Sequence, residues 1–191
     1  MAKTPVETAV DQVFDLFEQH GNADYIGEAI SQLEHACQAA QLAEREGFGE
    51  EVILAALFHD IGHLCEMNGE QPNMGGYGVM EHEKLGADFL RKKGFSETVA
   101  KLVQSHVQAK RYLCYADKEY YGKLSEASKK TLKYQGGRMT ATEASEFERD
   151  PLCHTIIRMR HWDEMAKEID MPLPNMEQFR KMAVEHLNAS H

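Results

Sequence analysis

The stretch "LFHDIGHL", residues 57–64, places His59 and Asp60 side by side at the end of a strongly apolar segment. Burying two adjacent ionisable side chains without partners carries a large free-energy cost. The longer stretch "EEVILAALFHDIGHL", residues 50–64, is apolar on nearly every side, which predicts one buried central helix. Imidazole and carboxylate groups together suit first-row transition metals. We therefore interpret the doublet as part of a metal site.

Helix signals on both sides of this segment predict an all-α protein. Thr4 and Glu7 have capping-box spacing before a helix that ends near Gly21, and Ser31 and Glu34 repeat the pattern. No stretch alternates apolar and polar residues as strands do, and no Pro/Ser-rich linker divides the chain, so we expect a single domain over residues 1–191. Further helices are predicted over 79–94, 97–115, 152–169 and 175–188, with one or two within 117–148, and a long loop over 65–78.

The composition narrows the class of partner. The chain has 31 acidic and 21 basic residues and a formal net charge of −10, which argues against nucleic acid or an anionic membrane as its partner. No apolar run is long enough to cross a membrane, and the first residues lack a signal-peptide pattern, so a cytoplasmic location is expected. The four cysteines form no CxxC pair and are expected to be reduced.

Ten histidines stand out in this composition, and several lie on the apolar faces of predicted helices. One histidine in a core is usually a structural residue, but their coincidence with the His-Asp doublet favours a metal centre. Asp163, one turn after Met159 on an apolar-faced helix, is the best late carboxylate, whereas Asp170 lies at a proline-rich break. The core-side histidines are His35, His59, His63, His82 and His106.

The order His35, then His59 with Asp60, then Asp163 resembles the pattern of the HD-domain superfamily, whose members are all-helical metal enzymes. The resemblance covers about residues 25–165 and implies a single HD-domain helical bundle, with this region as the metal-binding core.

His82 and His106 favour two metal ions over one. Asp60 can give one carboxylate oxygen to each ion. His35, His59 and Asp163 would then bind one ion, and His82 and His106 would bind the second. The second ion would then keep a coordination position open for substrate or O₂. Nitrogen and oxygen ligands without thiolate fit iron or manganese, and zinc stays compatible.

Both hydrolases and oxygenases occur in this superfamily. Dinuclear cyclic-dinucleotide hydrolases usually carry HDIGK and a His-His pair. In this chain His63 replaces the lysine, and Val107 follows His106. These departures weaken the hydrolase interpretation.

The flanking residues favour an oxygenase. The stretch "ADYIGEAISQLEHACQAA", residues 23–40, resembles the segment before the first ligand in HD-domain mixed-valent diiron oxygenases that cleave organophosphonates. The resemblance implies that Tyr25 and Glu28 cover the open iron site and that His63 helps to hold the phosphonate. Lys110, one turn after His106, can meet a phosphonate oxygen. The other pocket residues expected are Ser128, Thr131, Gln135 and Arg160.

The resemblance thus implies an enzyme with two iron ions, an Fe²⁺/Fe³⁺ pair, that uses O₂ and a small hydroxyphosphonate. The substrate would be (1-hydroxy-2-aminoethyl)phosphonate or its N-trimethyl analogue, and the products phosphate with glycine or glycine betaine. Two alternatives stay open: a dinuclear metal-dependent phosphohydrolase, and a non-catalytic ligand-binding HD module. Aromatic faces suit a trimethylammonium group. The supply of aromatic residues slightly favours the quaternary substrate. The aromatic side chains that could contact its trimethylammonium group are Tyr77, Tyr112, Tyr115, Tyr120, Tyr121 and Trp162.

Overall fold

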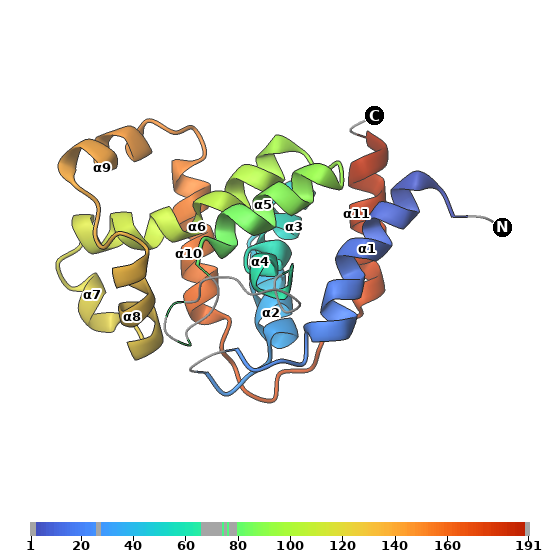
Figure 1. Ribbon diagram of the computed structural model, residues 1–191, viewed down its shortest axis with the longest axis horizontal. Helices are drawn as coiled ribbons and strands as arrows, with labels where there is room; N and C mark the ends of the chain where they lie inside the picture. The colour runs from blue at the N-terminus through green and yellow to red at the C-terminus, as the bar shows by residue number, and fades with distance from the viewer. Residues whose placement is uncertain (1–2, 26–27, 66–73, 75, 77–79, 190–191) are drawn as a thin grey trace.

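The computed structural model describes residues 3–25, 28–65, 74, 76 and 80–189. Within these ranges the regular structure is helical, and an isolated bridge between Asp24 and Ser31 is the one β-type pairing. The all-α fold class is therefore confirmed. The helices of the described ranges (Figure 1) are α1 (Pro5–His20), α2 (Gln32–Arg45), α3 (Glu50–Phe58), α4 (Ile61–Cys65), α5 (His82–Lys92), α6 (Glu97–Ala116), α7 (Tyr120–Lys123), α8 (Glu126–Tyr134), α9 (Ala141–Glu148), α10 (Cys153–Met165) and α11 (Met176–Ala189).

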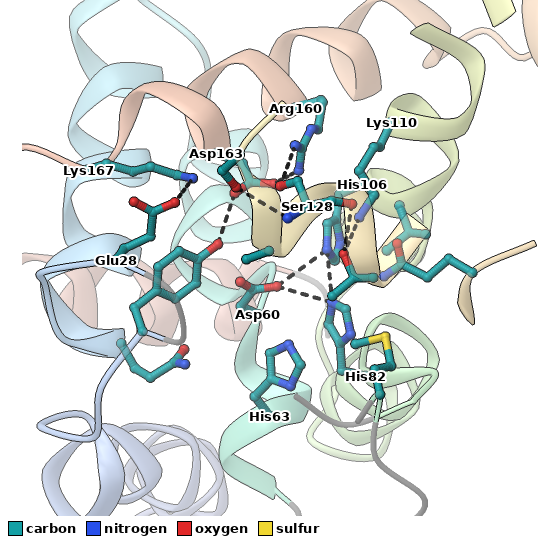
Figure 2. Close-up of a pocket in the computed structure, with 18 of the residues that line it drawn as sticks. Glu28, Asp60, His63, His82, His106, Lys110, Ser128, Arg160, Asp163 and Lys167 are labelled. Atoms are coloured by element: carbon teal, nitrogen blue, oxygen red, sulfur yellow. Dashed lines mark hydrogen bonds and ion pairs between the residues drawn. The ribbon is translucent and has the colours of Figure 1, made fainter. Parts of the chain in front are cut away.

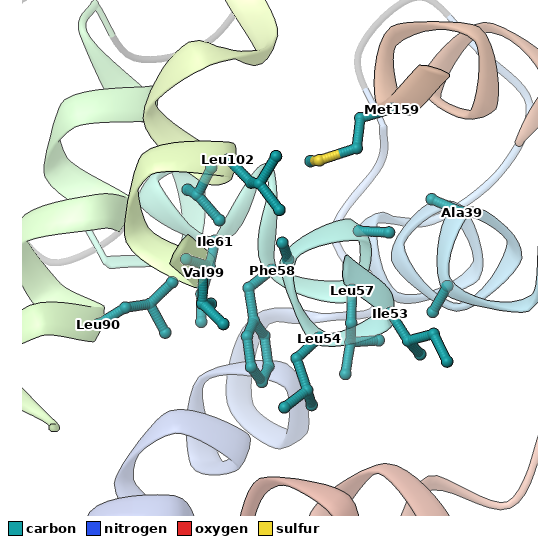
Figure 3. Packing of buried hydrophobic residues seen from close by; sticks show 14 of the residues in the cluster. Ala39, Ile53, Leu54, Leu57, Phe58, Ile61, Leu90, Val99, Leu102 and Met159 are labelled. Atoms are coloured by element: carbon teal, nitrogen blue, oxygen red, sulfur yellow. The ribbon is translucent and has the colours of Figure 1, made fainter. Parts of the chain in front are cut away.

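The helices pack around α3, which lies at the centre of the main hydrophobic core. Leu54, Leu57 and Phe58 of α3 are at most 1% exposed and meet side chains from α2, α5, α6 and α10 (Figure 3). The helices α7, α8 and α9 lie together at one end of the molecule, and α1 and α11 lie side by side at the other (Figure 1). The candidate ligands lie at the start of α2, the end of α3 and the break after it, the start of α5, the middle of α6 and the end of α10.

The predicted helix starts agree with the structure where side chains cap them. Thr4 accepts a hydrogen bond from the Glu7 backbone, and the Glu7 carboxylate accepts one from the Thr4 backbone. Ser31 and Glu34 make the same reciprocal pair at the start of α2. Each capping residue satisfies backbone donors that have no partner inside the helix.

The helix predicted over 50–64 is wrong in one respect, because it is broken at His59 and Asp60 into α3 and α4. The His59 Nδ1 atom lies 2.8 Å from the carbonyl oxygen of Ala56, which the backbone N–H of Asp60 would use in a continuous helix. The side chain therefore competes with the backbone for this acceptor. The break frees His59 and Asp60 from the regular helix, so that the imidazole and the carboxylate can both face the site.

Residues 117–148 form three short helices, α7, α8 and α9, instead of the one or two predicted. The predicted break at Gly136 and Gly137 is present, and both residues have positive φ. The helix predicted over 152–169 is shorter, because α10 ends at Met165. Beyond it the Ala166 carbonyl oxygen lies 2.8 Å from the His35 Nδ1 atom, so a tertiary contact replaces helical continuation.

Gly62 permits the close approach of α4 to the start of α5. A Cβ atom built on Gly62 would lie 1.9 Å from the carbonyl oxygen of His82, a distance that no real side chain tolerates. Only a glycine fits this contact. The glycine inside "HDIGHL" therefore sets the position of His82.

Most of the predicted loop over 65–78 lies outside the described residues. In the part of the chain that the structure describes, no helix combines the length and apolar character needed to cross a membrane. The four cysteines are free thiols, as expected.

Candidate metal centre and anion pocket

The first group of ligand atoms joins α2, the α3–α4 break and α10. The Nε2 atom of His35 lies 3.0 Å from Nε2 of His59 and 3.3 Å from Oδ1 of Asp163. Oδ2 of Asp60 lies 3.4 Å from His59 Nε2 and 3.8 Å from His35 Nε2. Three of these side chains are buried, and Asp60 is 12% exposed. These four donors surround a space that one metal ion could fill.

The second group lies on the other side of the same carboxylate (Figure 2). Oδ1 of Asp60 lies 3.2 Å from His82 Nε2 and 3.4 Å from His106 Nε2, and these two nitrogens are 3.2 Å apart. The His63 ring stacks on His82 with 3.9 Å between centroids and belongs to the same cluster of donors. Asp60 thus points one oxygen at each group, as the bridging role predicted for it requires.

The ring orientations test whether these groups fit metal ions. A carbonyl oxygen can only accept a hydrogen bond, so a histidine whose Nδ1 faces one carries its proton there and offers the Nε2 lone pair to the site. In the first group, the Nε2 atoms of His35 and His59, 3.0 Å apart, both offer such a lone pair. Two such lone pairs repel unless a proton or a metal cation lies between them, so the donors fit a cation. The Nδ1 contacts are His35 to Ala166, His59 to Ala56 and His106 to Val103, at 2.7–2.8 Å.

The electrostatics agree with that conclusion. Burial acts to lower the pKa of His59, but the charge of Asp60 and its hydrogen bond, together with the charge of Asp163, outweigh burial and raise this pKa to about 9. Burial likewise acts to raise the pKa of Asp60, and the charge of His59 with the neighbouring rings of His106 and His82 holds it well below its usual range. The protein without metal therefore keeps a proton in the first group, and a bound cation would displace it.

A cavity of about 240 Å³ opens over both groups. Two buried cations line it, Lys110 from α6 and Arg160 from α10, with exposed fractions of 4% and 5%. Lys110 donates to Thr131 at 2.9 Å, and an Arg160 nitrogen lies 3.5 Å from the Ser128 hydroxyl. Lysine and arginine side chains are rarely buried this deeply unless they have a partner or a function. Lys110 and Arg160 are therefore not ordinary surface charges exposed to solvent.

The charge state of this pair suits an anion. Burial, and then the charge of Arg160, lowers the pKa of Lys110 to about 7. Arg160 keeps its charge because it pairs with Asp163 and Glu164 and donates to the Tyr120 hydroxyl. An incoming dianion would raise the pKa of Lys110 and hold it protonated. Gln135 and His63, also predicted from the sequence, line the same cavity.

Tyr25 and Glu28 lie at the cavity, but not over the ligand group where the sequence placed them. The Tyr25 ring stacks on His35 with centroids 3.9 Å apart, and its hydroxyl donates to Asp163 Oδ1 at 3.3 Å. Tyr25 therefore contacts the first group, whereas the open coordination position was assigned to the second. The Glu28 carboxylate is engaged in an ion pair with Lys167.

Lys167 is a pocket residue that the sequence analysis missed. A signal existed, because Lys167 is four residues after Asp163 and so would share its face on a helix. In the structure α10 ends first, and Lys167 reaches the cavity from the segment behind it.

The aromatic residues proposed for a quaternary amine do not gather at the cavity. Among the described residues that line it, Tyr25 has the one aromatic ring besides the histidines. Trp162 is fully buried against Phe48, and the Tyr120 hydroxyl accepts a hydrogen bond from Arg160. Tyr77 lies outside the described residues. The slight preference for the trimethylammonium substrate therefore loses the support on which it rested.

The comparison with protein families agrees with the ligand geometry. The model of the HD domain matches residues 32–133, more than half of the chain. The chain belongs to the HD-domain family. The matched residues of this HD-domain protein run from the start of α2 through α8 and include five of the six candidate ligands; Asp163 lies beyond them.

Three relatives match almost the full chain. A [1-hydroxy-2-(trimethylamino)ethyl]phosphonate dioxygenase (glycine-betaine-forming) of Leisingera caerulea is 39% identical over 94% of this chain and 93% of its own. A hydroxymethylphosphonate dioxygenase of Gimesia maris is 39% identical over 94% and 88%. The uncharacterized protein L432 of Acanthamoeba polyphaga mimivirus is 42% identical over 95% and 83%. This HD-domain protein is therefore a homologue of phosphonate dioxygenases, as its sequence motifs predicted.

Proposed function

We propose that this protein is a diiron oxygenase that cleaves the C–P bond of a 1-hydroxyphosphonate with O₂. The carrying observation is that Asp60 links two groups of metal-binding side chains directly beneath a cavity with two buried cations. The sequence-based substrates are (1-hydroxy-2-aminoethyl)phosphonate and its N-trimethyl analogue, which give phosphate with glycine or glycine betaine. The names of two relatives support phosphonates as the substrate class.

The donor set supports iron. Every candidate ligand is an imidazole nitrogen or a carboxylate oxygen, a set that suits iron or manganese and is compatible with zinc. His35, His59, Asp60 and Asp163 would hold one ion, and Asp60, His82 and His106 the other. A mixed-valent iron pair would supply one-electron chemistry with O₂, which zinc lacks.

The side chains of the cavity have separate tasks in this proposal. Lys110 and Arg160 bind the phosphonate dianion, with the Ser128 and Thr131 hydroxyl groups fixing their direction. His63 approaches the same anion from α4. Tyr25, beside His35 and Asp163, and Glu28, paired with Lys167, border the cavity and would help to exclude water until substrate enters.

The overall reaction balances without an external reductant. A 1-hydroxyphosphonate, RCH(OH)PO₃H₂, and one O₂ give a carboxylic acid, RCOOH, and phosphoric acid. The C–H and C–P bonds at the same carbon break, one oxygen atom enters the carboxyl group and the other enters phosphate. The carbon is oxidised, and O₂ takes up all the electrons.

The main alternative is a dinuclear phosphohydrolase, in which a metal-activated water attacks a phosphate ester. The anion cavity suits that reaction as well. His63 stands where the dinuclear cyclic-dinucleotide hydrolases of this superfamily usually carry lysine, which argues against it. A ligand-binding module without catalysis would not need two ligand groups joined by one carboxylate.

Phosphate release under ¹⁸O₂ tests the proposal. The iron-loaded protein should hold about two irons per chain, release phosphate from a 1-hydroxyphosphonate only with O₂, and place ¹⁸O in both products. Its electron paramagnetic resonance signal after limited oxidation should be that of a coupled pair and should change when substrate binds. His82→Ala should abolish turnover, whereas His154→Ala, an exposed histidine away from the site, should not. Anaerobic phosphate release, or one metal per chain, would overturn the proposal.

A further inference from the structure

An ion pair between Glu28 and Lys167 closes one side of the cavity (Figure 2). The Lys167 Nζ atom lies 2.5 Å from Glu28 Oε1, and the two side chains are 22% and 20% exposed. The same ammonium lies 6.0 Å from the centre of the Tyr25 ring. Both residues line the cavity, so the pair contacts whatever the cavity binds.

The backbone beneath Lys167 is held in place on both sides by α2. The Ala166 carbonyl accepts from His35, and the side-chain amide of Gln38 makes two hydrogen bonds to the backbone of Glu168, at 2.8 Å and 2.9 Å. Gln38 is 4% exposed, so these bonds are protected from water. Lys167 therefore enters the cavity from a fixed position and stays within reach of Glu28.

Lys167 engages the Glu28 carboxylate, which would otherwise be available to a positively charged arm of a substrate. Asp60 and Asp163 belong to the ligand groups, and Asp163 also pairs with Arg160. Asp24 lines the cavity but is exposed, so water screens its charge. A substrate ammonium must therefore compete with Lys167 for Glu28.

We propose that Lys167 is a specificity-determining residue: by occupying Glu28 it disfavours phosphonates whose far end carries a positive charge, relative to phosphonates with an uncharged far end. The inference rests on the proposed function for its substrate class. Within that class Lys167 disfavours the two sequence-based substrates, whose far ends are cationic, relative to a hydroxyphosphonate with an uncharged arm. Removing the lysine should expose the Glu28 carboxylate to the arm.

Binding of two unreactive probes tests the inference without turnover. Methylphosphonate and 2-aminoethylphosphonate lack the 1-hydroxyl group and differ in the cationic arm. Their Kd values would be measured by anaerobic calorimetry on the iron-loaded protein and compared as a ratio, which cancels the shared attraction of the phosphonate to Lys167. Lys167→Met should shift the ratio towards 2-aminoethylphosphonate by about threefold or more, in the range expected for a partly exposed ion pair. Glu28→Gln should shift it the other way.

Two matched variants control for loss of a lysine as such. Lys167→Arg keeps the ion pair and should keep the wild-type ratio. Lys123→Met removes an exposed lysine that pairs with Glu119 away from the cavity, and it should also change nothing. An unchanged ratio in Lys167→Met, or a shift against the amine, would overturn the inference, and so would a wild-type protein that binds neither probe. If the ratio shifts as expected while no hydroxyphosphonate is turned over with O₂, the proposed reaction fails and the role of Lys167 stands.

Discussion

Replacing Gly62 with alanine should remove the metal ion held by His82 and His106 and spare the other. The new Cβ atom would lie 1.9 Å from the carbonyl oxygen of His82, and real Cβ atoms essentially never come closer than 3.0 Å to such an atom. α4 and the start of α5 must therefore separate by at least the difference between 1.9 Å and 3.0 Å. Metal–ligand distances tolerate only about 0.2 Å. The imposed displacement exceeds this tolerance several times over.

Metal analysis and thermal unfolding of the same samples measure this effect. We expect the iron content to fall from about two to about one per chain, because one ligand group moves out of range. The overpacking should also cost about 1–3 kcal/mol and lower the Tm of the metal-free protein by roughly 2–12 °C. Gly122→Ala is the control, since a Cβ atom there meets open space. Two irons per chain and a wild-type Tm in Gly62→Ala would refute the steric argument.

Three further predictions concern the bridge, the buried lysine and the metals. Asp60→Asn should reduce the metal content from about two to one or fewer per chain, since a neutral amide cannot give an anionic oxygen to both ions, whereas His35, His59 and Asp163 still form a ligand group; retention of two tightly bound metals would contradict a bridging role. Burial holds the pKa of Lys110 near 7, below its unfolded value of 10.5, so the unfolded metal-free protein binds more protons between these pH values. The destabilisation is complete below pH 7 and is relieved as pH rises, so the gain in Tm from Lys110→Met should shrink between pH 7 and 10, and a constant gain would contradict it. Chelation should lower the Tm of the wild type much more than that of Asp60→Asn, which differential scanning calorimetry can measure.

Local sequence signals predicted those features that depend on neighbouring residues. The reciprocal caps at Thr4 and Ser31 follow from spacing alone, because helix geometry brings the side chain of the N-cap residue close to the backbone three residues later. The candidate ligands could also be selected, because histidine and aspartate on apolar helix faces need a partner inside the protein. Their assignment as iron ligands remains a prediction, and the structure adds that their donor atoms converge.

The helix ends that sequence reasoning missed involve side chains that contact backbone carbonyls. The break between α3 and α4 occurs where His59 contacts the carbonyl of Ala56, three residues earlier, and α10 ends where the distant His35 contacts the carbonyl of Ala166. Neither competition is visible in helix periodicity, which counts only the backbone's own hydrogen bonds. The position of Tyr25 over His35 is decided in the same way, by packing between a loop and α2.

The sequence by itself determined the all-α class, most helix starts and the set of chemically capable side chains, since these depend on residue type and on separations of a few positions. Tertiary structure alone decided that Asp60 faces two histidine groups at once, that Gly62 sets the position of His82, and that Lys167 holds Glu28. The physical reason is that each of these contacts joins different helices or loops. Its geometry therefore depends on how the core packs them together, to within a fraction of an ångström.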